Sequence, residues 1–305
     1  MFENVNKEKK AGIVCCSNGI HPVHADRMEN LKVLLKSIGV DAVFSSCMYA
    51  EDGVFSGTAR ERADALMAFY KDDTVSEIFD VSGGDVANGI LPYLDYRVIA
   101  ESGKRFWGYS DLTTVLNAIY TKTGNPSMLY QIRNILGKDQ KQQLDDVKGL
   151  LQGVLCFRGE TKEDSVVYLE QPGNSFEIPC GFLKGNYMEG VVIGGNIRCF
   201  LKLAGTEYLP DFQDKILLLE SRGGTVAQME TYLSQLKQLG AFDKCSGILL
   251  GTFTEMEAEN CKPDMGELVL SYVREDQPVA VTRKIGHGRD AKGILIGSCA
   301  KIEDK

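Results

Sequence analysis

Short apolar runs alternate with longer amphipathic segments along the first half of the chain. The amphipathic segments carry apolar residues at helical spacing, as at Met28, Leu31 and Leu35. The apolar runs predict buried strands at 11–17, 40–46, 75–84 and 104–109, and the segments between them predict helices at 25–39, 57–72 and 111–124. This alternation predicts a mostly parallel sheet flanked by helices on both faces.

The second half has a different pattern, with more glycines around its strands. We expect a polar helix at 137–152, then strands at 188–196, 214–221, 245–253 and 278–288 and helices at 225–242 and 265–275. Between the halves, residues 157–181 lose the periodicity and gain Gly, Pro and charge. The sequence therefore predicts an N-terminal α/β domain at 1–155, a linker region at 156–180 and a C-terminal α/β domain at 181–305.

The composition of the chain argues against two kinds of partner, nucleic acids and membranes. The 305 residues are 44% apolar and carry a net charge of −8, and no run of lysine and arginine stands out beyond KEKK at 7–10. This argues against a nucleic-acid-binding protein. The N-terminus is polar, and no later stretch reaches 18 uninterrupted apolar residues. We therefore expect no signal peptide, no membrane span and a cytoplasmic protein.

Neither the cysteines nor the histidines predict a metal site or a disulfide framework. The nine cysteines contain no C-x-x-C pair. We expect reduced core residues at Cys15, Cys156, Cys199 and Cys299. His21 and His24 lie in the loop-like segment GIHPVHAD, and a lone His-x-x-His pair is a weak metal signal.

Three polar residues stand at the ends of predicted strands, where the ligands of parallel sheets bind. Ser110 follows the strand at 104–109, Glu220 follows the run ILLL, and His287 lies between two glycines. Serine, a carboxylate and histidine are the nucleophile, orienting acid and general base of serine hydrolases. Each also has a structural explanation: a helix cap, a solvated strand end and a loop residue, respectively.

Two glycine-rich stretches are candidate ligand loops. SGGDVANG at 82–89 follows a strand, and its backbone amides suit an anion or an oxyanion, but it lacks the lysine of a phosphate-binding loop. GHGRDA at 286–291 fits G-x-G-x-x-A, yet only 14 residues follow it, too few for a dinucleotide-binding unit. We expect no cofactor.

Four segments, in this order, resemble the LD-carboxypeptidase family of serine peptidases, which includes the microcin C immunity peptidases. They are SGGDVANGILPYLDY at 82–96, GYSDLTTVLNAIYTKTG at 108–124, VVIGGNIRCFLKLAGTEYLPDFQDKILLLES at 191–221 and IGHGRDAKGILIG at 285–297. The resemblance implies that Ser110 is the nucleophile, Glu220 the acid and His287 the base. It also implies an oxyanion hole formed by the backbone N–H groups of Gly84 and Asp111.

The family resemblance further implies an active site in an interdomain cleft, a homodimer, and hydrolysis of an amide at the end of a small peptide. The substrate is then a muropeptide with an L,D bond or a peptide-nucleotide conjugate. Two other classes remain open: a non-catalytic two-domain binding protein or sensor that uses the same cleft, and an α/β-hydrolase esterase. GYSDL lacks the second glycine of the esterase motif G-x-S-x-G.

The chain departs from the family pattern around the expected substrate wall. The carboxypeptidase branch commonly has Arg at the position of Ser82 and Tyr-Gly at the position of Asp85-Val86. The segment SMLYQIRNILG at 127–137 also lacks a Gly-Pro that the family often has. These departures leave the substrate open. Arg133 and Arg222 are conceivable ligands of a substrate carboxylate, although the simpler explanation of each is an ordinary surface or ion-paired arginine.

Overall fold

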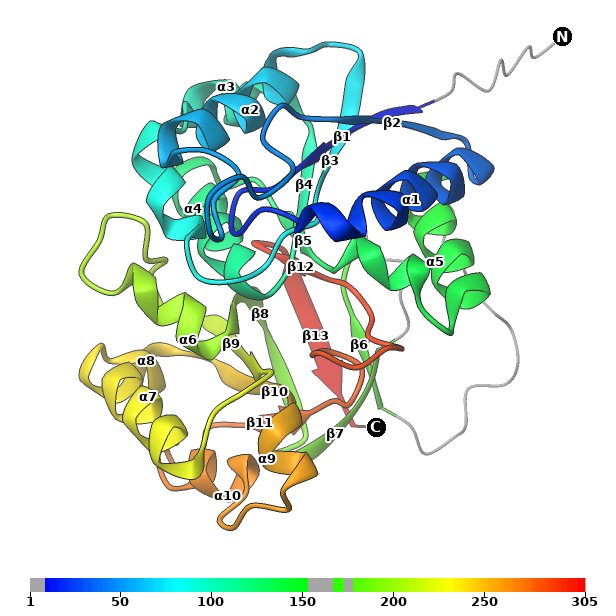
Figure 1. Ribbon diagram of the computed structural model, residues 1–305. Helices are drawn as coiled ribbons and strands as arrows, with labels where there is room; N and C mark the ends of the chain where they lie inside the picture. The colour runs from blue at the N-terminus through cyan, green and yellow to red at the C-terminus, as the bar shows by residue number, and fades with distance from the viewer. Residues whose placement is uncertain (1–8, 153–166, 173–177, 305) are drawn as a thin grey trace, which may run out of the picture.

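A computed structural model describes residues 9–152, 167–172 and 178–304. These residues form two sheets, which lie one above the other in Figure 1. The upper one is a six-stranded sheet in the order β12-β5-β4-β3-β1-β2, and the lower one is a closed barrel in the order β10-β11-β7-β6-β13-β8-β9. The predicted two-domain α/β architecture is therefore confirmed.

The first sheet takes its parallel strands from the first half of the chain. They are β1 (Lys9–Val14), β2 (Val40–Phe44), β3 (Val75–Asp80), β4 (Arg105–Gly108) and β5 (Ser127–Leu129). Figure 1 shows one group of helices on each side of this sheet. One group is α1 (Ala25–Ser37) and α5 (Gln140–Gln152), and the other is α2 (Ala59–Lys71), α3 (Tyr96–Ser102) and α4 (Thr113–Thr123).

Four short 3-10 helices connect these elements: η1 (Pro22–His24), η2 (Ala87–Tyr93), η3 (Ser110–Leu112) and η4 (Ile132–Leu136).

Strand β4 is fixed in the centre of the sheet by its apolar side chains. Trp107 is fully buried, packs edge-on against Phe79 with ring centroids 5.1 Å apart, and donates to the Glu77 carboxylate at 2.7 Å. A strand held in this way gives the residues after it, including Ser110, a defined position.

The barrel combines parallel and antiparallel pairs. Its strands are β6 (Val167–Glu170), β7 (Ile178–Lys184), β8 (Tyr187–Asn196), β9 (Lys215–Ser221), β10 (Gly247–Phe253), β11 (Val279–Val281) and β13 (Cys299–Glu303). The strands β8, β9, β10 and β11 pair in parallel, and β7, β6 and β13 close the barrel through antiparallel pairs. The helical segments are α6 (Ile197–Phe200), η5 (Leu201–Leu203), α7 (Val226–Gln238), α8 (Ala241–Lys244), α9 (Thr254–Ala258) and α10 (Met265–Leu270).

Two details of the expected domain division differ from the structure. The region 156–180, expected as a linker, contributes β6 and the start of β7 to the barrel. The region 181–305 contributes β12 (Ile294–Ile296) to the first sheet, where it pairs antiparallel with β5. Both differences arise from strand pairing between residues far apart in the sequence, which local periodicity does not report.

Three local expectations are also corrected. The expected strand at 278–288 ends at Val281, because the chain then turns, with the Lys284 amide donating to the Thr282 hydroxyl. The expected helix at 265–275 ends at Leu270, and the Ser271 hydroxyl caps the Leu268 carbonyl. Cys15 and Cys199 are buried as expected, whereas Cys299 is exposed on β13 and Cys156 lies outside the described residues.

The domains meet where helix α4 contacts the end of β8. The side-chain amide of Asn117 on α4 bonds both backbone groups of Gly194, and the Asn196 amide donates to the Thr113 hydroxyl at 3.0 Å. Gly195 has a φ of +127°, and a Cβ there would lie 2.8 Å from the Thr113 hydroxyl oxygen. The Gly-Gly pair therefore permits the close approach of the two domains.

None of the helices in the described ranges has the length and apolar character needed to span a membrane.

Candidate active site

Ser110 lies on a sharp turn directly after β4. Its φ is +56°, a left-handed value that is uncommon for a residue with a side chain. Two residues earlier, a Cβ on Gly108 would lie 2.6 Å from the Cβ of Leu112, so the turn requires glycine there. The first hydrogen bond of η3 runs from the Leu112 amide to the Tyr109 carbonyl at 3.1 Å. The Asp111 N–H precedes that bond and therefore has no partner within the turn.

Glu220 and His287 come from the barrel and are joined by a hydrogen bond. Glu220 is the last residue but one of β9, within its run of buried side chains, and its carboxylate is fully buried. The Glu220 Oε2 lies 2.8 Å from Nδ1 of His287, whose side chain is 15% exposed. Because a carboxylate only accepts, His287 donates through Nδ1, which leaves Nε2 free to accept a proton.

Tyr109 supports the Glu220–His287 pair from the first domain. Its hydroxyl donates to Glu220 Oε2 at 3.4 Å, and its ring packs on the His287 ring with centroids 4.9 Å apart. Burial, followed by the nearby Glu220 charge, raises the pKa of Tyr109 well above its usual value. Tyr109 therefore stays a neutral hydrogen-bond donor to Glu220.

The glycine-rich loop at 82–89 approaches Ser110 from β3. Gly84 has a φ of +129°, and a Cβ there would lie 2.2 Å from the side-chain amide carbon of Asn18. The base of the loop is held by the buried carboxylate of Asp80, which accepts from the amides of Cys16 and Ser82 at 2.7 Å each. A rigid loop of this shape can present the Gly84 N–H to a ligand.

The side chain of Asp111 has a second role in the structure. Its fully buried carboxylate accepts from the Ser17 hydroxyl at 2.6 Å and from the Ala87 amide at 2.8 Å, and it forms an ion pair with Lys202 of the barrel domain. Arg198, one helical turn before Lys202, pairs with Asp85. Lys202 also pairs with Asp85 at 3.7 Å, so three ion pairs cross between the domains next to Ser110.

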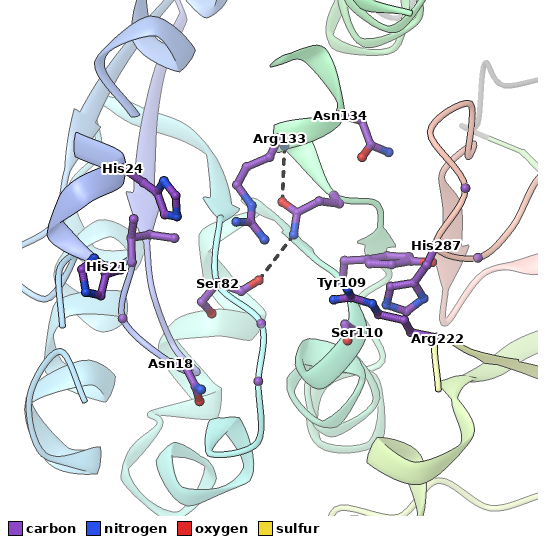
Figure 2. Close-up of a pocket in the computed structure, with 17 residues that line it drawn as sticks. Asn18, His21, His24, Ser82, Tyr109, Ser110, Arg133, Asn134, Arg222 and His287 are labelled. Carbon is purple, nitrogen blue, oxygen red and sulfur yellow. Dashed lines mark hydrogen bonds between the residues drawn. The ribbon is translucent and has the colours of Figure 1, made fainter. Parts of the chain in front are cut away.

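Ser110 lies between two pockets. The first has a volume of about 360 Å³ and is lined by all three histidines of the chain, so we call it the histidine pocket. Figure 2 shows Ser110, Tyr109, Arg222 and His287 on one side of the histidine pocket and Asn18, His21 and His24 on the other. The second pocket, about 570 Å³, shares Ser110, Gly84 and Arg222 with the first and extends over the barrel domain.

The five residues predicted from the sequence thus gather at one place. Ser110, Gly84 and His287 line the histidine pocket, Glu220 lies beneath His287, and Asp111 follows Ser110. No hydrogen bond joins Ser110 to His287 within the part of the chain that the structure describes.

Sequence reasoning missed the parts played by Tyr109, Lys202 and Arg198. Tyr109 has a signal in its position, because it directly precedes the candidate nucleophile at a strand end. Arg198 and Lys202 are spaced by four residues after the Gly-Gly pair, a spacing that aligns two charges on one helical face. Their acidic partners lie about a hundred positions away in the sequence and cannot be read from that spacing.

Two family models match the chain. The LD-carboxypeptidase N-terminal domain matches residues 11–130, and the LD-carboxypeptidase C-terminal domain matches residues 189–302. Among relatives, a probable murein peptide carboxypeptidase of Bacillus subtilis is 27% identical over 98% of this chain and 90% of its own length. The microcin C7 self-immunity protein MccF of Escherichia coli is 29% identical over 64% of this chain and 61% of its own length.

Solved structures agree with these matches. An MccF-like protein from Bacillus anthracis superimposes with a TM-score of 0.81 at 26% identity, covering 98% of this chain and 94% of that protein. MccF in complex with glutamyl sulfamoyl guanosine superimposes with a TM-score of 0.78 at 22% identity, covering 98% and 97% of the two chains. With both domain models matched in order and the same two-domain fold, the chain belongs to the LD-carboxypeptidase family.

Proposed function

We propose that this protein is a serine peptidase that hydrolyses the amide bond at the end of a small peptide or peptide-like conjugate. The observation that carries the proposal is the 2.8 Å hydrogen bond between His287 and the buried Glu220, beside Ser110 in one pocket. A serine hydroxyl is a poor nucleophile until a base takes its proton. His287, with Nε2 free and Nδ1 held by Glu220, is suited to that task.

The reaction begins with attack of Ser110 Oγ on the substrate carbonyl carbon, while the hydroxyl proton passes to His287 Nε2. The carbonyl oxygen becomes an oxyanion, which accepts hydrogen bonds from the N–H groups of Gly84 and Asp111. Donors of this kind each lower the barrier by roughly 3 kcal/mol in serine peptidases. Glu220 stabilises the imidazolium that forms on His287.

Collapse of the oxyanion breaks the carbon–nitrogen bond, and His287 gives its proton to the departing amine. The acyl group is then bonded to Ser110 Oγ. A water molecule attacks this ester, His287 takes the water proton, and Ser110 leaves with that proton restored. The products are an amine and a carboxylic acid. Each proton that is transferred passes through His287, which takes it from one group and gives it to the next.

Two substrate classes fit this chemistry. One relative is named as a murein peptide carboxypeptidase, and the solved MccF complex contains glutamyl sulfamoyl guanosine. Both point to small ligands with an aminoacyl group, for which pockets of about 360 and 570 Å³ on either side of Ser110 are adequate. We propose the muropeptide L,D bond and the aminoacyl-nucleotide amide as the two substrates to test.

The test is turnover of a lysine- or diaminopimelate-containing tetrapeptide and of an aminoacyl sulfamoyl adenosine, followed by mass spectrometry. We expect wild-type protein to release the terminal residue or the nucleotide part, and Ser110→Ala to lower kcat by roughly 10⁴- to 10⁶-fold. Equal rates for Ser110→Ala and wild type would overturn the mechanism. Saturable binding without product in both assays would instead support a non-catalytic binding protein.

A further inference from the structure

The histidine pocket is lined by two arginines and by histidine side chains, without a carboxylate among its described lining residues. Arg133, Arg222 and the three histidines line it, and no Asp or Glu is among its lining residues in the described ranges. The second pocket, in contrast, includes Asp85 and Glu255 in its lining. In a chain with a net charge of −8, this separation of charge favours an anionic ligand in the histidine pocket.

Arg133 is the group in this pocket that most requires a ligand. Its Nε is buried, and it has no hydrogen-bond partner within the described part of the chain. Burial lowers the pKa of the Arg133 guanidinium, an effect that the charge of Asp80 opposes. The Asp80 carboxylate is itself occupied by Cys16 and Ser82. A guanidinium remains charged, and a buried polar atom is normally paired, so the unpaired Nε and the face of Arg133 that is open to the pocket are best explained by an anion that arrives with the substrate.

The backbone holds Arg133 in place beside the glycine-rich loop. Arg133 lies in η4, and its amide donates to the side-chain oxygen of Gln131 at 3.3 Å. The same Gln131 side chain donates to the Ser82 carbonyl at 3.3 Å, and Figure 2 shows both bonds with the guanidinium extending into the pocket. Arg133 is therefore positioned relative to the loop that carries Gly84. It also lies in the segment 127–137, where the chain departs from the family pattern.

The two pockets differ in their access to His287. Ser110 lines both pockets. His287 lines the histidine pocket but not the second pocket. In the proposed mechanism His287 protonates the departing nitrogen, so the leaving group must lie on the side of His287. The acyl part of the substrate then occupies the second pocket.

We infer that the histidine pocket binds the leaving group and that Arg133 binds the terminal carboxylate of the amino acid being released. This inference rests on the proposed peptidase function and adds which end of the substrate each pocket takes. A guanidinium matches a carboxylate through two parallel hydrogen bonds, and such a pair also fixes the orientation of the scissile amide. A phosphate in the leaving group of an aminoacyl nucleotide offers oxygens of the same charge and shape.

The experiment compares kcat/KM for two substrates that differ in one group. They are the tetrapeptide L-Ala-γ-D-Glu-L-Lys-D-Ala and the same peptide with a C-terminal carboxamide. We expect the wild type to prefer the free acid by about 10- to 100-fold, as for hydrogen bonds to charged groups, and Arg133→Met to lose that preference. Arg133→Lys should retain part of it.

The matched control is Arg97→Met, which removes an exposed arginine paired with Glu101 on α3, remote from both pockets. It should keep the wild-type preference. If Arg133→Met unfolds, Arg133→Lys carries the comparison, with its thermal midpoint measured alongside. An unchanged acid-to-amide ratio in a folded Arg133 variant overturns the inference and leaves the peptidase function intact.

A nucleotide substrate is tested in the same design. If an aminoacyl adenosine phosphoramidate is cleaved and the tetrapeptide is not, Arg133→Met should lower its kcat/KM by a similar factor without affecting an uncharged aminoacyl anilide. If wild-type protein cleaves none of these compounds, the proposed function fails. Calorimetric binding of the tetrapeptide to Ser110→Ala and to Ser110→Ala/Arg133→Met then decides the inference, and equal or absent binding overturns it.

Discussion

Lys202 of the barrel domain forms an ion pair with Asp111 of the first domain, one residue after Ser110. The Asp111 side chain is fully buried, and the Lys202 side chain is 19% exposed and also donates to the Asp85 carbonyl at 2.9 Å. The pair therefore links the turn that carries the proposed nucleophile to the domain that carries His287. The ion pair therefore helps to fix the position of Ser110 relative to Glu220 and His287.

Removing the cation of this pair should be costly. We expect Lys202→Met to lower the free energy of unfolding by roughly 3 kcal/mol, because it leaves a buried carboxylate without its counter-charge. It should also lower kcat more than it raises KM, since Asp111 supplies a proposed oxyanion donor. Chemical denaturation and steady-state kinetics measure the two effects.

The exposed pair between Lys122 and Glu207 provides the control, because it also joins the two domains. Lys122→Met should lower the free energy of unfolding by less than about 1 kcal/mol. Equal losses for the two lysine variants would show that the buried pair has no special role.

Glu220→Gln tests the orientation of His287. A glutamine amide keeps the shape of the side chain but lacks the charge, and it can present a donor to Nδ1 and so favour the wrong tautomer. We expect kcat to fall by roughly 10³- to 10⁴-fold with little change in the thermal midpoint. Glu230→Gln, at an exposed carboxylate that accepts from Tyr272, should retain wild-type kinetics. A Glu220→Gln enzyme with full activity would remove Glu220 from the mechanism.

Alkaline pH should destabilise the protein through its buried tyrosines. Burial raises the pKa of Tyr70, Tyr96, Tyr109 and Tyr130. Above pH of about 10 these phenols ionise in the unfolded chain while they stay protonated in the folded one, so the unfolded state binds fewer protons. The stability they contribute is complete below that pH and is lost progressively above it.

Tyr109→Phe should make this decline shallower by up to about 1.4 kcal/mol per pH unit, measured by denaturation between pH 9 and 11. Tyr93→Phe, at an exposed tyrosine, is the control. An identical decline in wild type and Tyr109→Phe would contradict the assigned cause.

Gly286→Ala should disturb the position of His287. Gly286 has a φ of +143°, and a Cβ there would lie 1.8 Å from the Thr252 hydroxyl oxygen and 3.1 Å from the Thr252 backbone nitrogen. The backbone must therefore shift next to the proposed base, and we expect kcat to fall at least about 10-fold. Gly205→Ala separates strain from collision, because Gly205 also has positive φ but an added Cβ would meet nothing within 4 Å. Equal activity of both variants would show that the collision is absorbed elsewhere.

Much of the first domain could be predicted because its strands and helices are local in sequence. β1 to β4 and helices α1, α2 and α4 each coincide with a segment of clear periodicity. The pairing of β12 with β5 could not be predicted in this way, since it joins Ile294 to Leu129 and depends on the whole path of the chain. The closure of the barrel by β6, β7 and β13 was missed for the same reason.

In the candidate site, too, some residues could be predicted from local sequence and others only from the fold. Ser110 and Glu220 stand next to apolar strands, so a sequence pattern can single them out, and His287 carries a signal in its flanking glycines. Lys202 and Arg133 have ordinary sequence surroundings. Their significance comes from their surroundings in the fold: Lys202 pairs with the buried carboxylate of Asp111, and Arg133 lines the histidine pocket.

The segment between β11 and β12 crosses from the barrel to the first sheet and carries His287 on the way. It is fixed at one end by the Thr282 amide on the Leu250 carbonyl and at the other by the pairing of Ile294 with Leu129. During synthesis, the first domain therefore cannot complete its sheet until residue 296 has been made, although all its other strands are made before residue 130. A nascent chain would hold Ser110 long before it holds His287, the proposed base, so the proposed peptidase activity should appear only after residue 296 has been made.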